Sequence, residues 1–353
     1  MKKKILVVDD SALMRRVLCD IINSDDRFEV ADTAFDGIDG FKKICHNQYD
    51  AVVLDIYMPR LTGLELLKEM QKSHVSANVL VASTTTKEGA RETLLALEYG
   101  ALDFIQKPEN AADTKDASFQ KRFLMLLDVV SRAETKTEKP KAVQPAVSPI
   151  KPVIRAPRVS SGSKIIAIAS STGGPKALQE VIPKFPSDLK VPVLLVQHMP
   201  RGFTKSLAER LDELSPLPVK EAEDGDVLQA GHVYVAQGGK HMKVAMQGAK
   251  ACLQLTDEPA REGVKPCANY MYESLAESVY DEIICVVLTG MGGDGTAGIK
   301  NLETQKKVCV VAQNEETCAV YGMPKSIVAT GLASAIVPIS QVADEILKNV
   351  GVR

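Results

Sequence analysis

Short apolar segments of strand length alternate with segments of helical periodicity along most of this 353-residue chain. The alternation begins near residue 3, stops near residue 131 and resumes at residue 164. Repeated strand–helix units of this kind favour a parallel sheet that helices cover on both faces, which is the α/β class. Because the chain is too long for one ordinary hydrophobic core, the interruption predicts two domains.

The first part of the chain, residues 1–130, predicts a five-stranded, doubly wound sheet of the flavodoxin-like type. The expected strands cover residues 5–8, 30–34, 51–56, 79–82 and 104–106, and the expected helices lie near 12–23, 37–47, 63–72, 88–99 and 118–132.

Residues 131–163 lose both periodicities and differ in composition from what precedes and follows them. Prolines recur among Lys, Thr, Ser, Val and Ala, at Pro140, Pro145, Pro149, Pro152 and Pro157. This composition predicts a flexible, extended linker that lets two domains dock or separate.

Residues 164–353 predict a second α/β domain with a mostly parallel sheet and an antiparallel insertion. Turns at 224–226 and 237–239 separate short alternating segments at 233–235 and 242–246, which we assign to the insertion. The other expected strands are 165–169, 193–197, 283–289, 308–312 and 335–337, with helices near 176–183, 203–213, 269–279, 295–304, 319–329 and 341–349.

Composition excludes several classes of protein. The 45 acidic and 43 basic residues leave a net charge of −2, so the chain lacks a basic field for nucleic acid or an anionic membrane. No apolar run approaches the ~20 residues of a membrane span, and the run after Met1 stops at Asp9, too early for a secretory signal. The seven cysteines include no Cys-x-x-Cys pair, which argues against disulfides or zinc and indicates a cytoplasmic protein.

Polar residues follow four of the strands expected in residues 1–130. Asp9 and Asp10 fall at the end of the first strand and Asp55 at the end of the third, and these strands are neighbours in a 2-1-3 order. Three converging carboxylates need a cation, and hard oxygen ligands suit Mg²⁺. Ser83 and Lys107 end the fourth and fifth strands, where each could bind a phosphoryl oxygen. One acidic residue after a strand would be an ordinary loop residue, whereas this combination is harder to reach by chance.

Three segments carry a resemblance to response-regulator receiver domains: VVDDS at 7–11, LDIYMPRLTG at 54–63 and FIQKP at 104–108. The resemblance covers roughly the first 130 residues. It implies Asp55 as phosphoacceptor, Mg²⁺ held by Asp9, Asp10, Asp55 and the backbone carbonyl of Tyr57, phosphoryl contacts from Ser83 and Lys107, and a switch aromatic at Phe104.

Three polar loops of the second domain carry Ser171, His198 and Asp294, each after an expected strand. The carboxyl ends of parallel strands meet along one edge of a sheet, so these side chains are expected together. A serine, a histidine and an aspartate are the parts of a nucleophilic hydrolase. Ser171 alone could be a helix-capping residue, and a lone histidine is more often a surface or core residue.

The loop that holds Asp294 also matches the dinucleotide fingerprint Gly-x-Gly-x-x-Gly through Gly290, Gly292 and Gly295. The fingerprint calls for an acidic residue after the next strand, but Gln313 and Asn314 stand there. A nucleotide-binding enzyme is therefore a weaker alternative. A phosphorylation-gated scaffold with a vestigial site is another, against which the intact Ser, His and Asp argue.

The second domain lacks Gly-x-Ser-x-Gly, and its Ser…His…Asp order differs from that of α/β-hydrolases. Instead, ASSTGGP at 169–175, QHMPRGFT at 197–204, LTGMGGDG at 288–295 and VYGMP at 320–324 resemble the chemotaxis protein-glutamate methylesterase family (CheB). Together with the receiver, the resemblance covers essentially the whole chain. Three sites depart from the family pattern: Ala169 for Gly, Gln237 for Pro, and KPCAN at 265–269, which we expect near the substrate mouth.

The resemblance implies a phosphorylation-activated hydrolase of two-component signalling. It would hydrolyse glutamate methyl esters on chemoreceptors for chemotactic adaptation, and would also deamidate receptor glutamines. We expect Ser171 as nucleophile, His198 as base, Asp294 as its orienting group, and the N–H groups of Thr172 and Met291 as oxyanion donors.

The same resemblance implies Mg²⁺ at the receiver and no cofactor for the esterase. A chemotaxis histidine kinase would be the phosphodonor. We expect a monomer that neither binds nucleic acid nor inserts into a membrane, and whose unphosphorylated receiver covers the catalytic edge.

Overall fold

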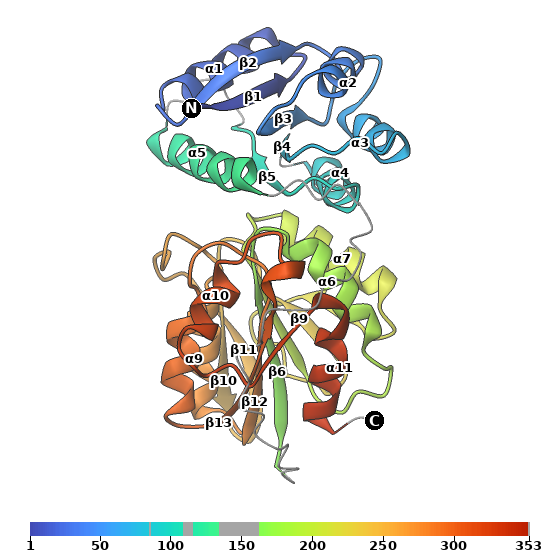
Figure 1. Cartoon of the computed structure of the whole chain (residues 1–353). Coiled ribbons are helices and arrows are strands. Elements are labelled where there is room, and N and C mark those ends of the chain that lie inside the picture. Colours follow the sequence, from blue (N-terminus) through green and yellow to red (C-terminus); the bar gives the residue numbers. More distant parts are fainter. Residues whose placement is uncertain (85, 109–115, 134–161, 352–353) are drawn as a thin grey trace, which may run out of the picture. The chain divides into compact units, whose positions relative to one another are not determined.

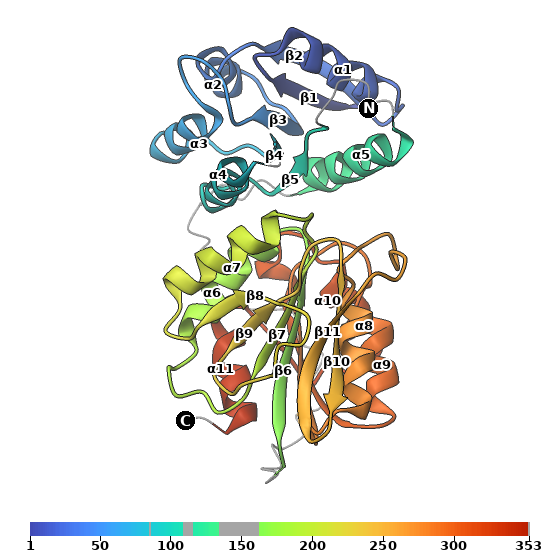
Figure 2. The ribbon, with the colours of Figure 1, turned by 180° about the vertical axis from the view of Figure 1, so that it is seen from behind.

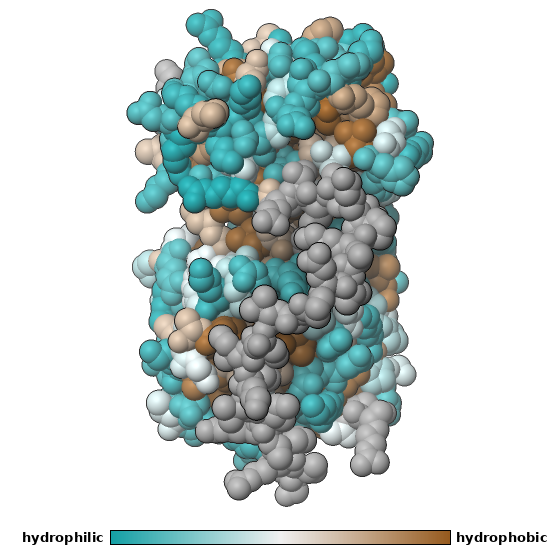
Figure 3. Space-filling model, viewed as in Figure 1, coloured by the Kyte–Doolittle hydropathy of each residue, from teal (hydrophilic) through white to brown (hydrophobic). Residues whose placement is uncertain are grey.

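The computed structural model describes residues 1–84, 86–108, 116–133 and 162–351, which are drawn in colour in Figure 1. The chain divides into two compact units, residues 1–146 and 147–353. Most of the linker predicted at 131–163 lies outside the described residues, and its boundaries stay a prediction. In the view of Figure 3, hydrophilic side chains cover much of the visible surface of each unit.

The first unit contains one sheet of five parallel strands in the order β2-β1-β3-β4-β5, which confirms the predicted doubly wound fold. Helices α1 and α5 contact each other, and α3 contacts both α2 and α4 (Figure 1). The elements are β1 (Lys3–Val8), α1 (Ala12–Asn23), β2 (Phe28–Ala34), α2 (Gly37–His46), β3 (Ala51–Asp55), α3 (Gly63–Lys72), β4 (Val79–Ser83), α4 (Lys87–Glu98), β5 (Asp103–Gln106) and α5 (Ala117–Arg132).

The central strands β3 and β4 are buried along their whole length, which explains why they read as unbroken apolar runs instead of alternating ones. Side chains from β1, β3, β4 and α5 share one core, as shown by Ile5, Val53, Leu80 and Phe123. The polar residues that follow these strands therefore emerge together from a rigid support.

The second unit is built on a sheet of seven parallel strands in the order β14-β13-β12-β6-β7-β9-β8. Its elements are β6 (Lys164–Ser170), α6 (Gly174–Val181), η2 (Ile182–Lys184), β7 (Val193–Gln197), α7 (Phe203–Leu214), β8 (Val219–Glu221), β9 (Val233–Val235), β10 (His241–Gln247), β11 (Lys250–Thr256), α8 (Ala268–Ser274), η3 (Leu275–Glu277), β12 (Glu282–Val287), α9 (Thr296–Glu303), β13 (Lys307–Gln313), η4 (Glu315–Thr317), α10 (Met323–Val328), β14 (Ala335–Val337) and α11 (Ile339–Val350).

Helices cover both faces of this sheet. Helix α6 contacts α7 and α11 on one face, whereas α9 contacts α8 and α10 on the other (Figure 2). Strands β10 and β11 pair as an antiparallel hairpin that contacts α8. The predicted class, a mostly parallel α/β domain with an antiparallel insertion, is therefore confirmed.

One local assignment in this unit was wrong, and two strands were missed. Residues 233–235 belong to the parallel sheet, where they lie between β7 and β8, and not to the antiparallel insertion. The sequence also gave no strand prediction for Val219–Glu221 or for Lys250–Thr256. Strands β8 and β9 have three residues each, which is too short for periodicity to reveal the direction of pairing.

Some predicted helices are longer than the observed ones. Helix α8 ends at Ser274, before a short 3-10 turn, and α10 begins only at Met323. Among the described residues, no helix is long and apolar enough to cross a membrane.

Candidate active site

The three strands that precede the predicted catalytic residues end at the same level of the sheet. Ala169 of β6 pairs with Val196 of β7 on one side and with Val287 of β12 on the other. Beyond the strands, the Ser171 N–H donates to the Thr289 carbonyl at 3.0 Å. The structure thus brings the loops of Ser171, His198 and Asp294 to one edge, as the sequence predicts.

His198 and Asp294 form a hydrogen-bonded pair, with 2.7 Å between Nε2 and Oδ2. Their side chains are only 8% and 3% exposed. An ionised carboxylate can only accept, so in the neutral imidazole Nε2 carries the proton and Nδ1 is left as the basic nitrogen. Asp294 therefore selects the tautomer that a general base requires.

Four further donors surround the Asp294 carboxylate. Oδ2 accepts from the Ala268 N–H at 2.6 Å. Oδ1 accepts from the Cys267 thiol at 3.0 Å, the Asn269 N–H at 3.0 Å and the Gly295 N–H at 2.8 Å. Burial by itself raises the pKa of Asp294, but the hydrogen bonds from its neighbours, with His198 first, bring that pKa down to about 2. The carboxylate is thus held ionised in a fixed orientation.

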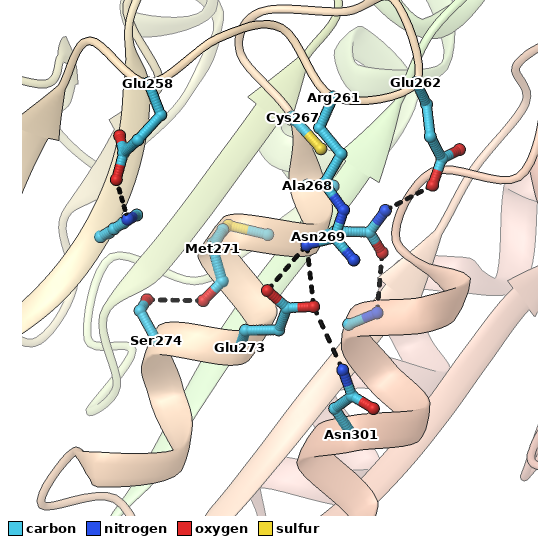
Figure 4. Close-up of polar contacts among 12 residues, drawn as sticks. Glu258, Arg261, Glu262, Cys267, Ala268, Asn269, Met271, Glu273, Ser274 and Asn301 are labelled. Atoms are coloured by element: carbon cyan, nitrogen blue, oxygen red, sulfur yellow. Dashed lines mark hydrogen bonds and ion pairs between the residues drawn. The ribbon is translucent and has the colours of Figure 1, made fainter.

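The segment that supplies three of these donors is itself fixed by side chains around the start of α8 (Figure 4). The Asn269 side chain accepts from the Gly298 N–H at 2.7 Å and donates to Glu262 at 2.8 Å. The Arg261 guanidinium binds both oxygens of Glu273, which lies one turn after Asn269, at 2.8 and 2.9 Å. The bond between Gly298 and Asn269 ties the start of α8 to α9.

Sequence reasoning did not foresee this role for residues 267–269, which it placed near the substrate mouth. The structure puts the Cys267 thiol and the next two N–H groups against Asp294. An effect of this segment on substrate choice stays a prediction.

Two buried polar side chains that were not among the predicted site residues brace the serine loop. Gln197 accepts from the Ser170 hydroxyl at 2.7 Å and donates to the Ser171 carbonyl at 2.9 Å. Thr289 donates to the Thr172 carbonyl at 2.9 Å. A polar residue at the end of an otherwise apolar strand was the signal that could have identified both.

The glycines of the Asp294 loop allow close packing around the site. A Cβ on Gly290 would lie 2.4 Å from the Met323 sulfur and 2.7 Å from the Ser171 Cβ. Gly292 and Gly295 have φ angles of +83° and +90°, which side chains disfavour. The glycine spacing that matched a dinucleotide fingerprint is thus accounted for by packing and backbone conformation.

The two predicted oxyanion donors lie next to these groups in sequence. Thr172 follows Ser171 and is buried, and Met291 follows Gly290 and is partly exposed. Their assignment as donors stays a prediction.

The first unit brings Asp9, Asp10 and Asp55 together, each with a carboxylate oxygen within 4.8 Å of the others. Lys107 Nζ lies 2.7 Å from an Asp9 oxygen and 2.8 Å from an Asp55 oxygen. Burial raises the pKa of Asp55 most, Lys107 lowers it and Asp9 raises it, for a value of about 6. The three clustered carboxylates are hard oxygen ligands of the kind that Mg²⁺ prefers, and the Lys107 ammonium compensates their negative charge only in part.

The remaining residues predicted for this site differ in their surroundings. The buried Ser83 hydroxyl lies 2.5 Å from the Thr93 hydroxyl and 3.2 Å from the Gly89 carbonyl, so it is engaged with α4. The Tyr57 N–H lies 3.4 Å from an Asp55 oxygen, and the Phe104 ring is buried. A phosphoryl group that accepted a hydrogen bond from Ser83 would compete with the hydrogen bonds of Ser83 to α4.

Comparison with known proteins shows which family this chain resembles. The model of the CheB methylesterase family matches residues 166–346, and that of the response regulator receiver domain matches residues 5–118. A protein-glutamate methylesterase/protein-glutamine glutaminase of Syntrophomonas wolfei is 41% identical, over 98% of this chain and 99% of that protein. One of Bacillus subtilis is 39% identical, over 97% of each. The crystal structure of the Thermotoga maritima CheB methylesterase catalytic domain is 40% identical, with a TM-score of 0.51, and covers 54% of this chain and 99% of that chain.

Proposed function

The chain belongs to the CheB methylesterase family and carries a response regulator receiver domain, and from this premise we propose a phosphorylation-activated protein-glutamate methylesterase. The observation that carries the proposal is the buried His198–Asp294 pair at the edge of the sheet that also holds Ser171. The proposed substrates are glutamate methyl esters of chemoreceptors, and the proposed setting is chemotactic adaptation in the cytoplasm by a monomer.

In the proposed reaction, Ser171 Oγ attacks the ester carbonyl while His198 Nδ1 takes its proton. The tetrahedral intermediate collapses, the imidazolium returns that proton to the methoxy oxygen, and methanol leaves. Water then attacks the acyl-enzyme with His198 again as base, which restores Ser171 and releases the glutamate carboxyl. For a receptor glutamine the leaving group is ammonia, which gives the deamidation that the names of the relatives describe.

Asp294 stabilises the imidazolium that forms in both steps, and its low pKa keeps it ionised throughout. The Thr172 and Met291 N–H groups are the proposed donors to the developing oxyanion. Removal of one donor of this kind typically costs ~2.7–4 kcal/mol in the barrier.

Regulation is proposed to begin with phosphoryl transfer to Asp55 from a chemotaxis histidine kinase. Asp9, Asp10, Asp55 and the Tyr57 carbonyl would hold Mg²⁺, which supplies positive charge to neutralise the phosphoryl oxygens. Lys107 already lies within hydrogen-bonding distance of Asp55 and would bind one of those oxygens. Ser83 would bind another phosphoryl oxygen, and Phe104 would act as the switch aromatic. Phosphorylation would thereby shift the conformational equilibrium toward the active enzyme.

The proposal is tested by methanol release from receptor membranes that carry labelled methyl esters. Wild type, Ser171→Ala and Asp55→Asn are each assayed with and without a small phosphodonor and Mg²⁺. We expect the phosphodonor to stimulate wild type, Ser171→Ala to be inactive, and Asp55→Asn to keep basal release without stimulation. Substantial release by Ser171→Ala would contradict the nucleophile, and no release by wild type from any receptor would favour a scaffold.

A second test concerns inhibition by the receiver. Deletion of residues 1–140 should raise basal methanol release, since it removes the proposed inhibitor. Unchanged or lower release from a folded truncated protein would count against inhibition by occlusion.

A further inference from the structure

Three helices that begin at the catalytic edge share an N-terminal pattern. Each has glycine as its N-cap, lacks a side-chain capping bond and has lysine as its third residue. The pairs are Gly173 and Lys176 in α6, Gly202 and Lys205 in α7, and Gly322 and Lys325 in α10.

The helices of the receiver begin differently. Each is capped by a Ser, Thr or Asp side chain, and α2, α3 and α4 carry Asp39, Glu65 and Glu88 in the first turn. Acidic residues are stabilising at this position because they complement the helix dipole, whereas lysines are unfavourable there. The lysines of the catalytic edge therefore do not contribute to stability through their position.

These lysines follow or adjoin the loops that hold the proposed catalytic residues. Lys176 is five positions after Ser171 in sequence, and Lys205 follows the loop of His198. Helix α10 is anchored at the site, because the Met323 N–H donates to the Gly290 carbonyl at 2.8 Å. Arg201, before the N-cap of α7, adds a fourth cation.

All four cations, Lys176, Arg201, Lys205 and Lys325, are exposed, and none forms an ion pair within the part of the chain that the structure describes. Of the acids near this edge, Asp257 pairs with Lys240 and Lys265, whereas Glu221 and Glu262 accept hydrogen bonds from Thr204 and Asn269. Two exposed acids, Glu315 and Glu316, follow β13, which is two strands away from the strand before Ser171. Three of the four cations, Lys176, Arg201 and Lys205, therefore lie in the segments that directly follow β6 and β7.

We propose that Lys176, Arg201, Lys205 and Lys325, here termed the cationic rim, recognise carboxylates that flank the ester on the substrate protein. The inference rests on the proposed function, because a protein with several methylatable glutamates presents free carboxylates beside the remaining esters. Each hydrolysis adds a carboxylate, so affinity rises as demethylation proceeds. Opposite charges of this kind accelerate association, and salt screens them.

The test compares the full chain with the triple variant Lys176→Glu/Lys205→Glu/Lys325→Glu. A control, Lys190→Glu/Lys250→Glu/Lys300→Glu, makes the same change in net charge at exposed lysines that carry no ion pair among the described residues and lie outside the rim. Both are assayed for methanol release from a methyl-labelled receptor cytoplasmic fragment with phosphodonor present. At about 50 mM KCl we expect kcat/KM of the rim variant to fall about tenfold or more through KM, with kcat retained.

Several further results are expected if the rim acts by charge. The difference should shrink at about 500 mM KCl, where the screening length is short. The control should match wild type, and the melting temperature of the rim variant should be equal or higher, since glutamate suits these helix starts.

Three results would overturn the proposal. An unchanged kcat/KM at low salt would mean that the rim does not bind substrate, and an equal loss in the control would mean that only net charge matters. A loss in kcat alone would indicate a structural role. No release by wild type would instead reject the proposed function itself, and the rim with it.

Discussion

Two buried aspartates, one in each unit of this chain, have their pKa values shifted in opposite directions. Asp55 in the receiver is raised to about 6, and Asp294 in the catalytic unit is lowered to about 2. Asp55 ends strand β3, Asp294 lies in the loop after β12, and both are almost fully buried. Burial raises the pKa of each, so the difference comes from the groups that surround the carboxylates.

The surroundings differ in the number of donors and in the sign of nearby charge. Asp294 receives five hydrogen bonds, three of them from backbone N–H groups that cannot move away. Asp55 shares the single ammonium of Lys107 with Asp9, and its one backbone contact is long, 3.4 Å from the Tyr57 N–H. Asp294, which is proposed to orient the base, is thus fully hydrogen-bonded. Asp55, which is proposed to accept a phosphoryl group, keeps a negative charge that its neighbours compensate only in part.

The largest effect is expected from a substitution of Asp294, the carboxylate with five hydrogen bonds. In Asp294→Asn the amide can donate as well as accept, so the tautomer of His198 with its proton on Nε2 is no longer selected. By analogy with other triads we expect kcat to fall about 10⁴-fold. Methanol release from labelled receptors measures it, with circular dichroism to verify folding. A folded variant within tenfold of wild type would mean that Asp294 does not orient the base.

The next prediction concerns the stability of the receiver. A folded-state pKa of about 6 against an ordinary value of 3.8 means that ionised Asp55 costs about 3 kcal/mol at neutral pH. Because the folded pKa is raised, stability is highest below about pH 4 and falls as pH rises through 6. Asp55→Asn should therefore be more stable than wild type at pH 8 and equal at pH 4.

Hydrogen exchange of the β3 and β4 amides in the full chain measures this difference, without interference from the catalytic unit. Added Mg²⁺ should reduce it, because a cation compensates the charge. For Asp294 the sign is opposite: its contribution is present above about pH 4 and is lost as pH falls toward 2. An Asp55→Asn difference that does not change with pH would show that the carboxylate is not destabilised by ionisation.

The smallest expected effect removes one donor from the Asp294 carboxylate. Burial, with Asp294 as a nearby negative charge, raises the pKa of the Cys267 thiol to about 12, so it acts as a neutral donor. Cys267→Ala should lower kcat about tenfold, which corresponds to one lost hydrogen bond to a charged group. It should also move the acidic limb of the pH–kcat profile, because the orienting carboxylate is held less firmly.

A matched variant separates positioning from packing at this residue. Cys267→Ser keeps a donor in nearly the same volume, so it should restore kcat and the pH profile. A serine variant as impaired as the alanine variant would mean that the thiol acts by packing alone.

The residues that could be predicted from the sequence are those whose position follows from strand order. Asp55, Ser171, His198 and Asp294 each follow an apolar run, and parallel strands that end at one level bring such residues together. The same reasoning fixed both fold classes. The three-residue strands β8 and β9 were missed or misplaced because so few residues show no period.

The three donors that residues 267–269 supply to Asp294 could not be predicted. Two of them are backbone N–H groups and the third is a thiol, and their segment enters the site from outside the sheet. No periodicity relates this segment to Asp294, which comes 26 residues after Ala268. For the same reason the link from Ser83 to Thr93 was not foreseen, since it depends on how α4 packs on β4. Contacts of this kind depend on how helices and strands pack against each other, and the pattern of strands and loops along the sequence does not reveal that packing.

The most direct test of the comparison replaces each aspartate by asparagine and measures methanol release from labelled receptors, with and without phosphodonor and Mg²⁺. The account predicts that Asp294→Asn loses basal and stimulated release alike, and that Asp55→Asn loses only the stimulation. Stimulation that survives in Asp55→Asn, or basal release that survives in Asp294→Asn, would contradict it.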